Sequence, residues 1–334
     1  MRNRKMWFAA ALAAAVMVSA AGCGGKGAGE GTSAASEETA AAAESAQETE
    51  AESSAGENAG PVRIATKPMT EQYILGEMLG LLIEDGTGYS VEITKGIGGG
   101  TSNIQPAMEK GEFDLYPEYT SSGWVLVLDH QAEGVDDEAM FTQLQQEYEE
   151  QFGMTWVGMY GFNNTFTIAV RRDTAEQYGL ENTSDLAAAA GNLTFGGNPD
   201  YIEREDGFGA LCETYGLDFG NVVDIDIGLK YQALAGGDID VTNAFTTDAQ
   251  LANPDMDLVT LADDKHLQVN YFCSTVVRQD ALEKFPGLED ILMQMDGLLT
   301  DQEMASLNYQ VEVEGLDEQD VARDFLAEKG LLEA

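Results

Sequence analysis

Basic residues are scarce in this chain, with 17 Lys and Arg against 59 Asp and Glu among 334 residues. The net charge of −42 excludes a nucleic-acid-binding protein, which needs basic patches to displace counterions. It also argues against adhesion to anionic lipid head groups by charge alone. The length allows two domains or one large two-lobed domain with a sizeable core. The remaining partners are small molecules and other proteins.

Residues that carry catalysis or hold metals are also few. Two His, three Cys and no Cys-x-x-Cys pair leave little material for a zinc site or a disulfide framework, so we expect no metal and no cofactor. Neither His130 nor His266 belongs to a nucleophile motif such as G-x-S-x-G. The glycine-rich segment GIGGG at 96–100 matches neither G-x-G-x-x-G nor a Walker motif. It indicates a tight turn with Thr101 or Ser102 as helix N-cap, and no enzyme activity is predicted.

The N-terminus has the pattern of an export signal. Basic residues precede an apolar run over residues 6–18, which is too short for a membrane-spanning helix, and small residues then lead to Cys23. A cysteine in this position resembles a bacterial lipobox, although Ala20 stands where Leu is usual. The resemblance implies a lipidated Cys23. The alternative is simple secretion with cleavage near Ala21 or Gly22.

The next segment is predicted to be a tether. Residues 24–60 consist almost entirely of Gly, Ala, Ser, Thr and Glu, with no aromatic or branched aliphatic side chain. Such a stretch buries too little apolar surface to offset the entropy of ordering it. We therefore expect a signal peptide over 1–22, followed by the lipidated cysteine and a disordered acidic tether over 23–60.

The rest of the chain alternates between short apolar strands and helical periodicity. The expected strands are 62–66, 89–94, 113–116, 193–196, 222–227 and 241–245, and the expected helices are 70–84, 101–110, 209–215, 231–235, 281–295, 300–309 and 318–329. This rhythm predicts an α/β fold with mainly parallel sheets. Two groups of elements, before and after about residue 165, suggest two lobes.

Several segments in order resemble the substrate-binding proteins of osmoprotectant ABC importers, the glycine betaine, choline and carnitine family. They are ATKPMTEQYILG at 65–76, GGTS at 99–102 with GEFDLYPEYT at 111–120, GFNNTF at 161–166, GLKYQAL at 228–234 with NAFTTD at 243–248, and DDKH at 263–266 followed by Tyr271. The similarity extends over nearly all of residues 62–315.

The resemblance implies a type II periplasmic-binding-protein-like fold, in which two crossover segments join the lobes around a ligand cleft. Crossings are expected near 161–167 and 266–271. The first lobe would then comprise 62–163 with 270–334, and the second 164–269. The implied protein is a lipid-anchored receptor on the extracytoplasmic face of the membrane. Its implied partners are a quaternary-ammonium solute and the permease and ATPase of an ABC importer.

A quaternary ammonium has no N–H group to donate, and aromatic faces that attract its charge and cover its methyl groups can hold it. The resemblance implies that Tyr119, Phe166, Phe245 and Tyr271 form this cage. Tyrosine is usual where Phe166 and Phe245 stand, so these two rings keep the face but lack the hydroxyl. For each ring taken alone, ordinary core packing remains the alternative.

The cage alone is too weak for tight binding. Four cation–π contacts give about 8 kcal/mol before the costs of ordering and closure, and micromolar affinity already needs about 8 kcal/mol net. The resemblance implies further ligand contacts at Lys67, Ser122 and Arg204. An Arg can hold a carboxylate bidentately, which favours glycine betaine or carnitine over choline. A surface pairing of Arg204 with Glu203 or Glu205 remains the alternative.

Other functions stay open at this level. Choline, proline betaine or ectoine could be the solute on the same scaffold. A receptor that feeds a sensor kinase, and an extracellular enzyme without a recognisable nucleophile, base or metal set, are further alternatives.

Overall fold

The computed structural model describes residues 60–131, 135–204 and 207–333. The expected signal peptide, Cys23 and the tether up to residue 59 lie outside the described residues. In the part of the chain that is described, no helix combines the length and apolar character that crossing a membrane requires.

One five-stranded sheet defines what we call the first lobe. Its strand order is β2-β1-β3-β10-β4. The strands are β1 (Val62–Ala65), β2 (Val91–Thr94), β3 (Leu115–Tyr119), β4 (Met154–Asn163) and β10 (Phe272–Arg278). Strand β1 runs parallel to β2 and β3, whereas β10 runs antiparallel to both of its neighbours. The chain thus returns late in the sequence to place β10 in the middle of this sheet.

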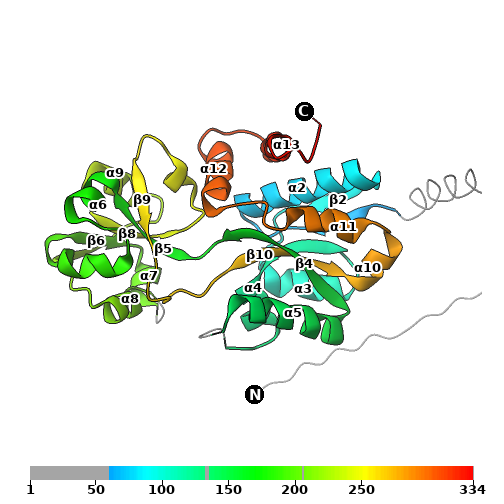
Figure 1. Ribbon diagram of the computed structural model, residues 1–334, viewed down its shortest axis with the longest axis horizontal. Helices are drawn as coiled ribbons and strands as arrows, with labels where there is room; N and C mark the ends of the chain where they lie inside the picture. Colours follow the sequence, from blue (N-terminus) through cyan, green and yellow to red (C-terminus); the bar gives the residue numbers. More distant parts are fainter. Residues whose placement is uncertain (1–59, 132–134, 205–206, 334) are drawn as a thin grey trace, which may run out of the picture. The chain divides into compact units, whose positions relative to one another are not determined.

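Helices cover both faces of the first sheet (Figure 1). One face carries α2 (Thr70–Thr87), α11 (Leu288–Leu292) and α13 (Glu318–Glu328), and the other carries α3 (Thr101–Glu109), α4 (Thr120–Ser122) and α5 (Asp137–Phe152). The π-helix Gly123–Val127 continues α4, and α10 (Gln279–Lys284) follows β10. Helix α2 is apolar over most of its length, and Ile74, Leu75 and Met78 are fully buried in the core.

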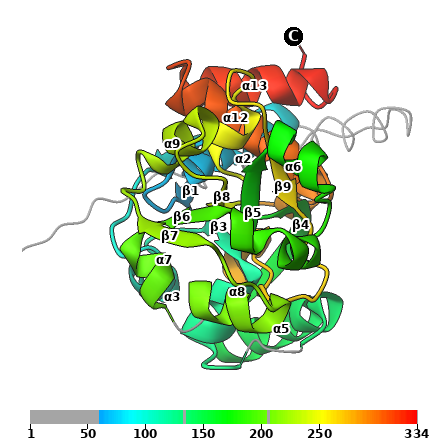
Figure 2. The ribbon, with the colours of Figure 1, turned by 90° about the vertical axis from the view of Figure 1, so that its left-hand side faces the viewer.

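A second five-stranded sheet defines the second lobe, and Figure 2 looks toward it. Its order is β7-β6-β8-β5-β9. The strands are β5 (Phe166–Arg171), β6 (Thr194–Gly197), β7 (Asn221–Asp224), β8 (Val241–Phe245) and β9 (Leu258–Leu261). The helices are α6 (Arg172–Tyr178), α7 (Pro199–Glu203), α8 (Phe208–Tyr215), α9 (Lys230–Gly236) and the 3-10 helices Thr183–Ala188, Ala190–Asn192 and Ala249–Ala252.

The expected α/β fold with two groups of elements is confirmed, but the expectation of mainly parallel sheets is wrong. Strand β5 pairs antiparallel with both β8 and β9, as β10 does with its neighbours in the first lobe. These are the strands through which the chain enters one lobe from the other. No crossover helix precedes them, and an antiparallel pairing does not need one.

Two local predictions also differ from the structure. The expected helix 281–295 is divided into α10, α11 and the 3-10 helix Met293–Met295, because Pro286 and Gly287 interrupt it. At the glycine turn, the N-cap of α3 is Gly100 rather than Thr101 or Ser102. The Thr101 hydroxyl instead donates to Glu118 at 2.7 Å.

The chain passes between the sheets at Asn164 and Thr165 and again between β9 and β10 (Figure 1). The division of the lobes at 163/164 and 269/270 remains a prediction.

Helix α12 (Asp301–Glu312) begins where the chain packs closely against β4. Gly161 has a φ of +105°, and a Cβ there would lie 2.5 Å from the Leu299 carbonyl oxygen, so only glycine allows this approach. The Leu299 N–H donates to the Tyr160 carbonyl at 2.8 Å. A capping box between Thr300 and Glu303 then starts the helix. The position of α12 is therefore fixed by β4.

Candidate functional site

A cavity of about 390 Å³ lies where the two lobes meet. Its walls come from both lobes. They comprise the start of α2, the end of β3, the Asn164–Thr165 crossing with the start of β5, the end of α7, the end of β8 with the loop that follows it, the residue before β10, and α12. This volume falls in the range of about 300–1,000 Å³ that is usual for small-molecule sites.

All four aromatic residues of the expected cage line this cavity. Tyr119 ends β3 and Tyr271 directly precedes β10, so both lie at the edge of the first sheet where these two strands meet the cavity. Phe166 begins β5 and Phe245 ends β8, and the two are opposite each other in the antiparallel register. Their rings stack with centroids 4.5 Å apart. Phe245 is 36 % exposed, which is unusual for a ring that serves only core packing.

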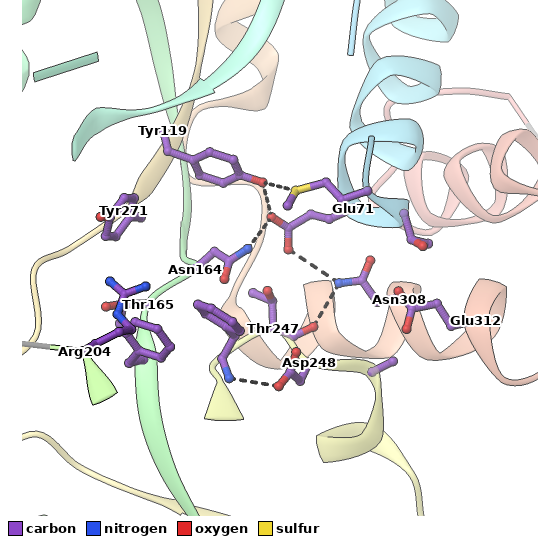
Figure 3. A pocket seen from close by; sticks show the side chains of 15 residues that line it. Glu71, Tyr119, Asn164, Thr165, Arg204, Thr247, Asp248, Tyr271, Asn308 and Glu312 are labelled. Atoms are coloured by element: carbon purple, nitrogen blue, oxygen red, sulfur yellow. Dashed lines mark hydrogen bonds between the residues drawn. The ribbon is translucent and has the colours of Figure 1, made fainter. Parts of the chain in front are cut away.

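Arg204 also lines the cavity, at the end of α7. Its guanidinium carbon lies 5.2 Å from the centre of the Phe166 ring. In Figure 3, Arg204 lies on the side of the cavity away from Glu71. A planar cation next to ring faces is suited to an anionic group on a ligand that those rings hold.

Lys67 and Ser122 are not among the described residues that line the cavity. Lys67 is only 7 % exposed, and its ammonium pairs with the fully buried Glu118. The same ammonium lies 4.6 Å from the centre of the Tyr119 ring. Lys67 thus lies behind one cage ring, and its charge neutralises a buried carboxylate. Ser122 belongs to the short helix α4.

The most notable feature that the sequence analysis missed is Glu71, in the first turn of α2. Its side chain is almost completely buried, and one carboxylate oxygen accepts from the Tyr119 hydroxyl at 2.5 Å and from Asn164 Nδ2 at 3.0 Å (Figure 3). The other oxygen accepts from Asn308 Nδ2 at 3.5 Å. No Lys or Arg among the described residues forms an ion pair with Glu71. It is a buried acid held by neutral donors.

Burial raises the pKa of the Glu71 carboxyl, and hydrogen bonds from Tyr119, Thr247, Asn164 and Asn308 partly oppose this shift. Burial, followed by the nearby Glu71 carboxylate, raises the pKa of Tyr119 well above its ordinary value. The phenol therefore keeps its proton and donates a hydrogen bond to Glu71.

Asp248, a second acid of the cavity wall, has a different environment. It accepts from the Phe245 N–H at 2.9 Å and from the Tyr231 hydroxyl, and the Lys230 ammonium lies 3.8 Å away. The Lys230 ammonium compensates the charge of Asp248. The Asp248 carboxylate in turn holds the backbone N–H of the cage residue Phe245.

Helix α12 contributes Asn308 and Glu312 to the cavity. Asn308 Nδ2 donates to the Thr247 carbonyl at 2.9 Å as well as to Glu71. One side chain thereby connects α2 of the first lobe with the loop after β8 of the second lobe. No local sequence pattern indicates this role, because α12 lies far along the chain from the other elements that form the site.

Elsewhere, His130 contacts Glu147 at 2.9 Å near α5. Among the described residues, no group of three or more His, Cys, Asp or Glu side chains has a geometry that could hold a metal ion.

Comparison with known proteins identifies relatives over most of the described region. The family model for the substrate-binding domain of ABC-type glycine betaine transport systems matches residues 60–328. The chain is 41 % identical over 273 residues to the ergothioneine transport permease/ergothioneine binding protein EgtU of Helicobacter pylori. The matched region covers 81 % of this chain but 48 % of that protein. The chain thus spans about half the length of that relative.

Two further relatives are matched over most of their own length. The chain is 32 % identical over 280 residues to the carnitine transport binding protein OpuCC of Listeria monocytogenes, covering 83 % of this chain and 90 % of that protein. A crystal structure described as a glycine betaine/carnitine/choline ABC transporter superimposes with a TM-score of 0.75 and 31 % identity, covering 81 % of this chain and 99 % of that one.

The buried charge of Glu71 predicts a measurable effect on stability. Folding raises the pKa of Glu71 above its ordinary value of 4.5, so the favourable contribution of this group is fully present below pH 4.5 and is lost as pH rises through the folded-state pKa. The variant Glu71→Gln keeps the shape without the charge. In thermal melts without ligand at pH 8, we expect it to melt about 2–4 °C above the wild type, which corresponds to about 1 kcal/mol.

The two melting temperatures should converge as pH falls toward 4.5. Glu77→Gln is the matched control, since Glu77 lies on the same helix and is also buried but forms an ion pair with Lys95 at 2.7 Å. That variant should gain no stability. A Glu71→Gln protein that melts below the wild type at pH 8 would contradict this account of the buried carboxyl.

Proposed function

Because this chain belongs to the family of substrate-binding domains of ABC-type glycine betaine transport systems, we propose that it is the receptor of an importer for a quaternary-ammonium zwitterion. Proteins of this family bind a substrate and are not enzymes. The observation that carries the proposal is the meeting of four aromatic rings, from both lobes, at one cavity that also contains Arg204.

The rings supply the attraction that a permanently methylated nitrogen requires. Tyr119 and Tyr271 come from the first lobe, and the stacked pair Phe166 and Phe245 comes from the second. A cation between them gains from the ring quadrupoles, while its methyl groups cover apolar surface. Since both lobes contribute rings, ligand binding would favour closure of the lobes about the two crossings.

Arg204 is the group that we assign to the carboxylate of the zwitterion. Lys67 and Ser122, which the resemblance also implied, do not line the cavity, and the charge of Lys67 is already compensated by Glu118. A carboxylate beside Arg204 would form charge-assisted, bidentate hydrogen bonds. This favours glycine betaine or carnitine, while choline, proline betaine and ectoine are alternatives on the same scaffold.

Ergothioneine is a second candidate, favoured by the 41 % identity to the Helicobacter pylori protein that is named for it. Ergothioneine is a betaine of a sulfur-bearing histidine, so it offers the same trimethylammonium and carboxylate and adds an imidazole-type ring. The aromatic cage and Arg204 would hold it in the same way, and a cavity of about 390 Å³ has room beyond the betaine group.

The partners in this proposal are the permease and ATPase of an ABC importer, to which the receptor would deliver its solute. The lobes that close on the ligand would be residues 62–163 with 270–334 and residues 164–269.

The role of Arg204 can be tested by titration calorimetry with glycine betaine, carnitine and choline. We expect both zwitterions to bind more tightly than choline. Arg204→Ala should weaken glycine betaine by about 1.5–3 kcal/mol, the usual contribution of a hydrogen bond to a charged group, and leave choline almost unchanged because choline has no carboxylate. Arg172→Ala is the control, since Arg172 pairs with Asp257 at the exposed surface of α6. Choline binding most tightly to the wild type would contradict the assignment.

We also propose that the mature protein is anchored to the extracytoplasmic face of the membrane through a lipid on Cys23. The support is the sequence alone, namely the basic start, the short apolar run and the small residues before Cys23. A Cys23→Ser variant should lose incorporated lipid and appear in the soluble extracellular fraction. If the wild type incorporates no labelled fatty acid, secretion without an anchor is the correct interpretation.

A further inference from the structure

The cavity has a second polar end, opposite Arg204, that the proposed betaine contacts do not use. Figure 3 shows Glu71 and Asn308 on this side and Arg204 with Tyr271 on the other. Glu71 is 3 % exposed, and both Glu71 and Asn308 line the cavity. This end of the cavity presents a hydrogen-bond acceptor, the Glu71 carboxylate, to which the surrounding neutral side chains donate.

The donors leave the two carboxylate oxygens unequally satisfied. The oxygen facing Tyr119 and Asn164 accepts two bonds, at 2.5 and 3.0 Å, whereas the bond from Asn308 to the other oxygen is 3.5 Å long, and Thr247 also interacts with the carboxyl. An ionised carboxylate has about four lone-pair sites, and 3.5 Å is near the limit of a hydrogen bond. A stronger donor on a ligand could therefore replace this long bond.

Glycine betaine cannot supply that donor. Its trimethylammonium and carboxylate are joined by one methylene group, so a molecule held by the cage and Arg204 has nothing that extends to Glu71. It also has no N–H group at all. A buried carboxylate without a cation or a strong donor is costly, and buried charges are normally paired. The cation of bound glycine betaine, held against the Tyr119 ring, would compensate the charge of Glu71 but would donate no hydrogen bond to it.

We propose that Glu71 accepts a hydrogen bond from an N–H group on the side chain of the bound betaine. The preferred ligands would thus be betaines of amino acids that carry an N–H-bearing ring. This inference rests on the proposed function and deepens it. The cage and Arg204 hold the betaine group common to all candidates, and Glu71 selects among them by the third substituent.

The alternative is that Glu71 is a positioning residue only, which orders Tyr119, Asn164 and Asn308 at the meeting of the lobes. Both roles require the carboxylate, so loss of affinity in a variant would not separate them. A difference between two ligands would separate them, because a positioning role affects every betaine alike.

Two betaines, of which only one has a ring N–H group, allow this comparison of affinities. N,N,N-trimethylhistidine and N,N,N-trimethylphenylalanine share the quaternary nitrogen, the carboxylate and an aromatic ring, and only the first has a ring N–H. Titration calorimetry at pH 8 keeps the imidazole mostly neutral. We expect the wild type to bind trimethylhistidine at least tenfold more tightly, although the phenyl ring is the more apolar of the two, since a site built around a hydrogen bond discriminates against the analogue that lacks the donor.

The variant Glu71→Gln, whose folding is checked by its melting curve, should reduce this preference to about threefold or less, because a hydrogen bond to a neutral amide is weaker than one to a carboxylate. The readout is the ratio of the two affinities, so an equal loss of affinity for both betaines does not count as loss of the preference. The control Glu77→Gln should keep the full preference, since Glu77 does not line the cavity.

The outcomes separate the two proposals. Equal affinity of the wild type for both betaines overturns the role of Glu71 and leaves the proposed function standing. An undiminished preference in Glu71→Gln assigns the selection to another group and also overturns it. If the wild type binds neither betaine and glycine betaine does not bind either, the proposed function itself fails.

Discussion

A quaternary ammonium ion has no hydrogen to donate, and this limitation governs the chemistry of a pocket that would bind one. Ring faces attract such a cation without requiring a donor, but each contact is weak and has to be repeated from several directions. The fold meets this requirement because strands from both sheets end at the same cavity. Tyr119 is the last residue of β3, while Phe166 and Phe245 are paired across β5 and β8.

The polar groups make the two ends of this cavity chemically different. Arg204 lies at one end, next to the rings that would hold the cation, and Glu71 lies at the other, surrounded by neutral donors. A carboxylate buried without a counter-charge lowers the stability of the unliganded protein, and such costs are typical of functional positions. Asp248 illustrates the contrast, because Lys230 compensates its charge and its role is to hold Phe245 in place.

Resemblance to a family selected the rings and Arg204, all of which line the cavity, because each of these residues lies in a short recognisable segment. The same resemblance implied a ligand contact at Lys67, which does not line the cavity, and local sequence does not show that Glu118 is buried beside Lys67 and compensates its charge. Glu71 was overlooked because acids are so common in this chain that no single one stands out. Asn308 depends on the packing of α12 against β4, which is a long-range contact that no local pattern encodes.

The fold was predictable to a similar degree. Alternating apolar strands and helices indicated two α/β lobes, but the antiparallel strands β5 and β10 follow from how the chain passes between lobes, and local periodicity does not report that. The most direct test of the whole account is a crystal structure with a bound betaine. The account predicts a quaternary nitrogen within about 6 Å of the ring centres of Tyr119, Phe166, Phe245 and Tyr271, with the carboxylate on the Arg204 guanidinium. A ligand bound away from these rings, or with its carboxylate turned from Arg204 toward solvent, would contradict it.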